Sequence, residues 1–163
     1  MNSKKTKICI LIVIIVAIII TLLMLFGKKE VVRDAKWDEN MESVIRREQK
    51  NNPDSKIVVN DSSIQVNYVS MYDEPCYVAY DFGEDNKLCE ITFGFHTSDG
   101  TTFEDLDEIL NSEYGKEDSY EDFGTISQTK KWVKKDYTIT LEYIPQDTST
   151  INWSDLKIEY KKQ

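Results

Sequence analysis

The residues best suited to chemistry surround the single histidine of this 163-residue chain. His96 is followed by Thr97, Ser98 and Asp99, so an imidazole, two hydroxyls and a carboxylate share one short segment. Catalysis would need a nucleophile or a second base that the fold brings to the imidazole, in a cleft that gathers it with carboxylates. The sequence contains no Gly-x-Ser-x-Gly elbow, phosphate loop or zinc-spaced cysteine and histidine set. We therefore predict a protein that is not an enzyme and has no catalytic or cofactor-binding residues.

Acidic clusters are the second chemical feature, at residues 83–86 and 104–108. A calcium loop places oxygen ligands at alternate positions and a glycine at the turn. Asp81, Gly83 and Asp85 do not meet this requirement, because the glycine takes a ligand position. The carboxylates are expected to be solvated charges, and we predict no metal site.

Cys76 and Cys89 are the third feature, and they fall on the two strands of a predicted hairpin. If the chain turns within residues 83–86, Tyr80 faces Cys89 and the two thiols stay apart. A tighter turn at Phe82 and Gly83 would bring them together as a disulfide. That bond would close a loop of twelve intervening residues and stabilise the fold by about 3 kcal/mol. Both alternatives are open from the sequence.

A long apolar segment, Ile8 to Phe26, lies near the N-terminus and contains no charged residue among its nineteen positions. As a helix it would be about 28 Å long, close to the roughly 30 Å of a bilayer core. No small-residue cleavage site follows it. The expectation is a cell-membrane protein with a single-pass signal anchor. Residues 1–7 form a cytoplasmic tail, residues 27–35 a juxtamembrane linker, and residues 36–163 a C-terminal domain outside the cytoplasm.

The remaining chain is strongly acidic. The whole protein has a net charge of −9, and residues 1–29 carry five lysines and no acid, so residues 30–163 have a net charge of −14. A surface of this charge repels the phosphates of nucleic acids. We therefore predict no nucleic-acid partner, and we expect basic proteins to be attracted.

Hydrophobic periodicity predicts an α+β domain of two helices and seven strands, in the order α-β4-α-β3. Asp38 is the predicted N-cap of the first helix, and Gly115 is the predicted stop of the second. The helices are expected at 38–50 and 102–114, and the strands at 56–59, 64–68, 76–82, 88–95, up to 133, 137–143 and 156–160. The sheet is predicted to be antiparallel, with both helices on one face. Residues 116–126 are expected to be an irregular polar loop and the best candidate for a contact surface.

Several of these residues form a pattern that resembles small envelope proteins of unknown function in Gram-positive bacteria. The pattern consists of Trp37, Asp38, Met41, Glu42 and Val44; Phe103, Leu106, Leu110, Tyr114, Gly115 and Lys116; and Trp132, Ile158 and Tyr160. The helix-plus-sheet repeat is also similar to that of β-lactamase inhibitor proteins and of small lipoproteins that assist outer-membrane assembly. Those relatives bind other proteins, which the resemblance implies here as well.

Together these features predict a membrane-anchored, extracytoplasmic protein-binding domain that contacts the membrane through Ile8 to Phe26. The alternative is an inhibitor or immunity protein that neutralises a basic toxin or hydrolase through its acidic surface. Strong salt dependence of binding would favour the alternative. A protein partner is expected in both cases, and a small-molecule cofactor in neither.

Overall fold

The computed structural model describes residues 32–95, 100–124, 126–144 and 156–163. The chain divides into two compact units, Met1–Lys36 and Trp37–Gln163, and the second contains all the helices and strands discussed below. The predicted anchor, Ile8 to Phe26, and His96 lie outside the described residues.

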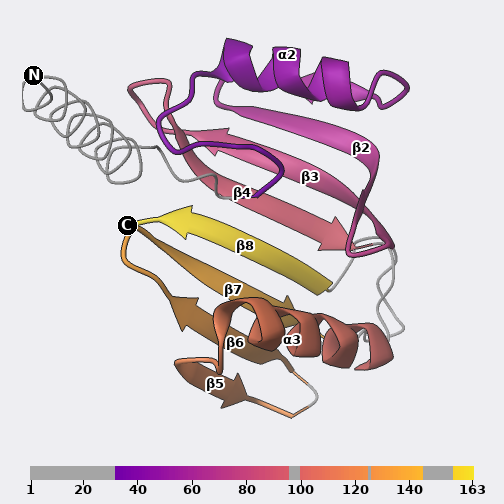
Figure 1. The fold of residues 1–163 in the computed structure, drawn as a ribbon, viewed down its shortest axis with the longest axis vertical. Helices are drawn as coiled ribbons and strands as arrows, with labels where there is room; N and C mark the ends of the chain where they lie inside the picture. Colours follow the sequence, from indigo (N-terminus) through magenta and orange to yellow (C-terminus); the bar gives the residue numbers. More distant parts are fainter. Residues whose placement is uncertain (1–31, 96–99, 125, 145–155) are drawn as a thin grey trace, which may run out of the picture. The chain divides into compact units, whose positions relative to one another are not determined.

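A single antiparallel sheet of eight strands forms the second unit, in the order β1-β2-β3-β4-β8-β7-β6-β5 (Figure 1). Each half of the sheet is a meander, and β8, the last strand of the chain, joins them by pairing with both β4 and β7. The strands are β1 Ile57–Val59, β2 Ser63–Met71, β3 Glu74–Phe82, β4 Leu88–Phe95, β5 Ser119–Asp122, β6 Gln128–Val133, β7 Tyr137–Tyr143 and β8 Leu156–Lys162.

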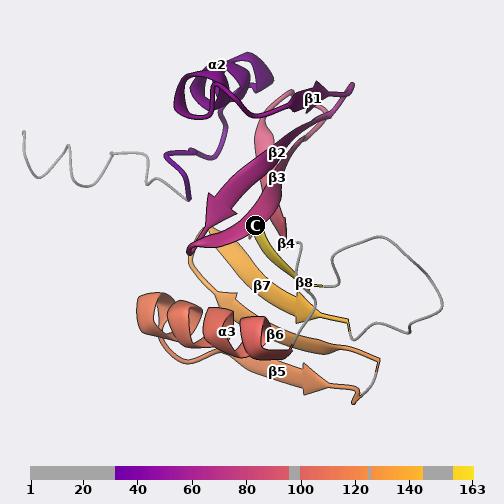
Figure 2. The same ribbon diagram turned by 90° about the vertical axis from the view of Figure 1, so that its right-hand side faces the viewer.

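Two helices, α2 (Met41–Asn51) and α3 (Gly100–Tyr114), lie on the same side of this sheet (Figure 2). The N-cap of α2 is Asn40, whose side-chain oxygen accepts a hydrogen bond from the Ser43 amide at 2.9 Å. The predicted cap, Asp38, is wrong because this residue has a positive φ of 71°, whereas an N-cap needs an extended backbone. Gly115, at φ +83°, ends α3 as the sequence predicts.

The core lies between the helices and one face of the sheet. Alternate residues of neighbouring strands line up there in rows that are completely buried, because the strand period of two places them on the same face. One row consists of Val66, Val78, Phe93, Ile158 and Leu141, and the next of Ile64, Tyr80, Ile91, Tyr160, Ile139 and Trp132. The opposite face carries half-exposed, mostly polar residues.

The predicted fold class is wrong in its proportions and its strand count. The domain is mostly sheet, and its element order is α-β4-α-β4 rather than α-β4-α-β3. The additional strand is β5, which lies in the segment 116–126 that was expected to be an irregular loop. All four residues of β5 are exposed, so burial imposes no alternation on the sequence. Pairing with β6 alone makes this segment a strand.

The predicted single-pass membrane protein is also corrected. Within the described ranges no helix is long and apolar enough to cross a membrane. The helices α2 and α3 have 11 and 15 residues, or about 17 and 23 Å, and a bilayer core is roughly 30 Å thick. This finding on the described residues contradicts the predicted transmembrane signal anchor and the predicted placement of the domain outside the cytoplasm.

Cys76 and Cys89 are not joined by a disulfide. The chain turns at residues 83–87, and a bulge after Asp81 leaves Cys89 without a direct partner in the register. The extra residue shifts the pairing, so that Tyr80 faces Ile91 rather than Cys89, and Cys76 faces Phe95. The thiols are therefore separated along the hairpin, and the alternative of two unbonded cysteines is the one observed.

Candidate functional site

The sequence motifs do not converge on a catalytic centre in the described residues. His96 lies outside them, so the predicted absence of catalysis is not tested at that position. No group of three or more histidine, cysteine, aspartate and glutamate side chains in the described ranges is arranged to hold a metal ion. In the acidic turn after β3, Asp85 accepts a hydrogen bond from the Lys87 amide at 3.2 Å. This carboxylate therefore stabilises the turn itself.

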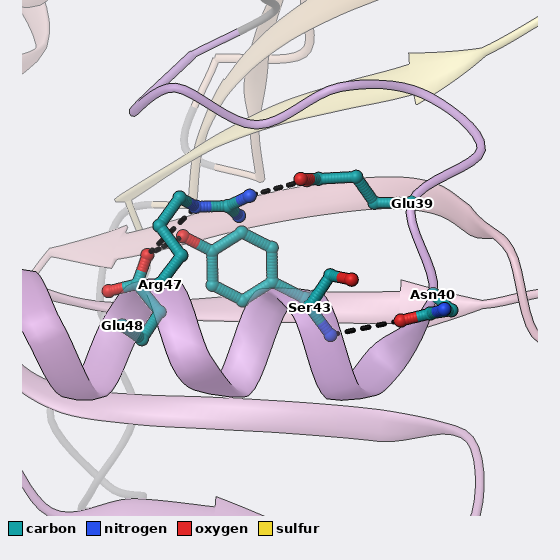
Figure 3. A network of polar contacts seen from close by, with 6 residues as sticks. Glu39, Asn40, Ser43, Arg47 and Glu48 are labelled. Atoms are coloured by element: carbon teal, nitrogen blue, oxygen red, sulfur yellow. Dashed lines mark hydrogen bonds and ion pairs between the residues drawn. The ribbon is translucent and has the colours of Figure 1, made fainter.

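The first other candidate for a functional site is a buried polar network under α2 (Figure 3). Glu48 is 1% exposed and accepts hydrogen bonds from the Tyr80 hydroxyl at 2.5 Å and from the Asn52 side-chain amide at 2.8 Å. Arg47 forms an ion pair with Glu39, and its Nε lies 3.9 Å from Glu48 Oε1. The Arg47 guanidinium also lies over the Tyr80 ring, 5.7 Å from its centroid.

This network holds α2 against β3. Tyr80 is completely buried and Glu48 almost so, which leaves no exposed group to meet a substrate. Buried charges with perturbed surroundings occur at structural ion pairs as well as at active sites. We therefore assign this network to the stability of the fold.

The second candidate for a functional site is the face of the sheet that the two helices do not cover. The Tyr77 ring lies over Gly94, where an added Cβ would come within 2.2 Å of it. Glu90 pairs with Lys161 at 2.8 Å. Burial, and then repulsion from Glu90, raise the pKa of Asp81 above its ordinary value. This face holds charges of both signs that largely compensate one another, so it does not favour one class of partner.

A pocket of about 350 Å³ lies between α3 and the strands at the β5 edge of the sheet. Antiparallel pairing places its strand residues side by side, because Tyr120 faces Lys130 across β5 and β6, and Gln128 faces Tyr143 across β6 and β7. The helix contributes the other wall. The lining residues are Phe103, Glu104, Asp107, Tyr120, Gln128, Lys130 and Tyr143.

The pocket combines charged groups with aromatic rings. The Lys130 ammonium forms an ion pair with Asp107 and lies over the Tyr120 ring, 5.2 Å from its centroid. The Phe103 and Tyr143 rings pack with their centroids 5.8 Å apart at 36°. The side chains of Lys130 and Asp107 are only 15% and 18% exposed, so this ion pair is partly shielded from water. The pocket can therefore bind a polar group whose stem packs against aromatic rings.

The hairpin of β5 and β6 next to the pocket has an apolar tip. Tyr120 is 48% exposed, Phe123 59% and Ile126 71%. The Phe123 amide donates to the Ser127 carbonyl at 2.8 Å, and the Gly124 amide donates to the Asp122 carboxylate at 2.7 Å. These bonds close the turn with its large side chains pointing away from the core. The sequence predicted a contact surface in this segment, but as an irregular loop.

The exposed side of α3 is acidic. Glu104, Asp105, Glu108 and Glu113 are all exposed there, and the helix sequence contains no lysine or arginine. Together with the acidic β5 they create a negative potential around the pocket. A cationic group is therefore attracted to this part of the surface.

Comparisons of the chain with protein-family models, with curated proteins and with solved structures find no match. The resemblance to Gram-positive envelope proteins therefore stays a prediction.

A cluster of tyrosines joins the β2–β3 turn to α3. Tyr72, in the turn, donates a hydrogen bond to Glu113 at 2.8 Å. The Tyr114 and Tyr160 rings lie with their centroids 6.5 Å apart. Burial raises the pKa of Tyr72, of Tyr114 and, most strongly, of Tyr160 above the ordinary value. All three hydroxyls are therefore protonated in the folded state at neutral pH.

Alkaline pH is expected to destabilise the fold through this cluster. A pKa that is raised on folding stabilises the protein fully below about pH 10, the pKa in the unfolded chain, and the stabilisation is lost as pH rises through the folded pKa. For the buried Tyr160 the loss approaches about 1.4 kcal/mol per pH unit. Urea unfolding at pH 8, 10 and 11, with tyrosinate absorbance recorded in parallel, measures it. The variant Tyr160→Phe should show a shallower fall. Complete tyrosine ionisation near pH 10 in a protein that stays folded would contradict the expectation.

Proposed function

We propose that this chain is a non-enzymatic protein-binding domain. Its contact surface, which we call the hairpin surface, consists of Tyr120 on β5, Phe123 and Ile126 at the hairpin tip, and the adjoining acidic side of α3. The observation that carries the proposal is the grouping of the exposed apolar side chains. Eight large ones are exposed in the described residues, and three of these eight lie within residues 120–126.

Scattered apolar residues on a surface need no explanation, but grouped ones with a polar rim are typical of protein interfaces. Aromatic side chains next to a pocket supply the kind of anchor that dominates binding energy. The pocket shares Tyr120 with the hairpin surface, so both features serve one contact. Nothing in this arrangement requires a chemical reaction.

Affinity capture of the full-length chain after cross-linking in its native cells tests the proposal. The variant Phe123→Ser with Ile126→Ser removes the apolar tip without touching the core. We expect a stoichiometric partner with the unmodified chain and at least a tenfold loss with this variant. The matched control is Val58→Ser with Val59→Ser, on the exposed β1 at the opposite edge of the sheet, which should retain the partner. Equal capture by both variants, or capture of the bait alone, would overturn the proposal.

The acidic side of α3 supports the second candidate function, an inhibitor or immunity protein for a basic toxin or hydrolase. Interfaces between opposite charges weaken as salt screens them. A loss of affinity of tenfold or more between about 0.05 and 0.5 M salt would favour this candidate. An affinity that is insensitive to salt would favour contact through the apolar tip alone.

A further inference from the structure

We propose that the pocket between α3 and β5–β7 binds an arginine side chain of the protein partner. This inference rests on the proposed function and specifies the chemistry of that contact. Lys130, a cation of the chain itself, already occupies one side of the pocket. Its ammonium is held by Asp107 and by the Tyr120 ring, so the pocket walls stabilise positive charge.

A second carboxylate is available for a cation from outside. Glu104 lines the same pocket and precedes Asp107 by three positions, a spacing that places both on one side of a helix. Glu104 is exposed and forms no ion pair with any described residue. Glu104 and Asp107 together outweigh the single charge of Lys130, so the pocket has a net charge of −1. An anionic ligand would have to displace Asp107 and pass the acidic side of α3.

Size and shape favour a guanidinium. A volume of about 350 Å³ is at the lower end for ligand sites and suits one long side chain better than a nucleotide-sized cofactor. The planar guanidinium stacks on aromatic rings and can form two parallel hydrogen bonds with a carboxylate, which an ammonium cannot do. Tyr120 and Tyr143 offer the rings, and Glu104 offers the carboxylate. The partner is therefore expected to present an arginine next to an apolar patch that covers Phe123 and Ile126.

Titration of the isotopically labelled full-length chain with N-acetyl-arginine amide, followed by NMR, tests this inference. We expect saturable shifts that are confined to α3 and β5–β7, and weaker binding of N-acetyl-lysine amide. N-acetyl-norleucine amide, which has a similar stem without the charge, should cause no saturable shift. The absence of shifts with the arginine probe would overturn the inference, and equal binding of the lysine probe would overturn the choice of a guanidinium.

Two glutamates of α3 provide matched variants. Glu104→Gln removes the pocket carboxylate, and Glu108→Gln removes an exposed carboxylate that does not line the pocket. We expect at least threefold weaker binding of the arginine probe with Glu104→Gln and no change with Glu108→Gln. Equal effects of the two substitutions would show that the acidic surface attracts the probe in general, and would overturn the assignment of the pocket as the arginine site.

The result of the arginine titration is independent of the result of the partner capture that tests the proposed function. The variant Phe123→Ser with Ile126→Ser leaves the pocket carboxylates in place and should bind the arginine probe normally. If the partner is captured through the hairpin surface but the probe does not bind, the protein-binding function stands and the arginine pocket is wrong. If the probe binds but no partner is captured, the pocket stands as a cation site and the proposed function is wrong.

Discussion

Replacement of Glu48 by alanine is expected to lower the free energy of unfolding by about 3 kcal/mol. The substitution removes the acceptor of the Tyr80 hydroxyl and of the Asn52 amide, and it leaves Arg47 with less compensation for its buried charge. Breaking a buried pair costs about 3 to 5 kcal/mol, and the lower figure applies because Arg47 keeps its ion pair with Glu39. Urea denaturation at pH 7 measures the loss.

The same helix supplies the control. Glu42 pairs with Arg46 one turn away, but both side chains are more than 70% exposed, so Glu42→Ala should change the stability by less than about 0.5 kcal/mol. The double variant Glu48→Met with Tyr80→Phe removes the unsatisfied hydroxyl together with the carboxylate. It should recover part of the loss, because replacing both partners of a buried hydrogen bond costs less than replacing one. If Glu48→Ala costs no more than Glu42→Ala, the network does not hold α2.

Glu48 is a buried residue that the hydrophobic pattern of the sequence does not indicate, although its spacing from Val44 does. The apolar residues at helical spacing, Trp37, Met41, Val44 and Ile45, include one of the two buried residues of α2, Val44, but not the other, Glu48. These two are four positions apart and therefore lie on one side of the helix. A charged residue at core spacing, with Tyr80 at a core position of a nearby strand, indicates a buried polar contact.

The strands were predictable where one side is buried. Tyr137 to Tyr143 alternates apolar and polar residues, and the structure has a strand there with Ile139 and Leu141 in the core. The edge strand β5 was not predictable, because an exposed strand with a free edge needs no alternation and is often charged. The positive φ of Asp38, which leaves Asn40 as the N-cap of α2, depends on how the preceding chain enters the helix, which no local pattern specifies.

The pocket was less predictable from the sequence than the edge strand β5. Asp107 and Lys130 are 23 residues apart and belong to elements whose packing decides whether they meet. Asp107 was part of an acidic cluster that was expected to be solvated, and only the fold shows that its carboxylate is largely covered. The acidic composition of α3 could be inferred from the sequence, and a contact surface in residues 116–126 remains a prediction. Their combination into one site required the tertiary structure.

Replacement of Trp132 by alanine is expected to cost about 3 to 5 kcal/mol of stability. Trp132 is completely buried, and it lies opposite Ile139 in the row of core residues that crosses the sheet. Its indole N–H donates to the Gly115 carbonyl at 2.8 Å, which fixes the end of α3 to β6. The substitution therefore opens a cavity and leaves a carbonyl at the helix end without its donor. Thermal and urea unfolding of the full-length chain measure the loss.

Two further substitutions separate the cavity from the hydrogen bond. Trp132→Phe keeps most of the apolar contact but removes the donor, and should cost roughly 1 kcal/mol for the bond plus a smaller packing loss. Val133→Ala, at the adjacent position with a 53% exposed side chain, should change the stability by less than about 0.5 kcal/mol. Because Trp132 joins α3 to β6, Trp132→Phe should also weaken binding of the arginine probe while the protein stays folded. Unchanged probe binding in Trp132→Phe would mean that the position of α3 does not depend on this hydrogen bond.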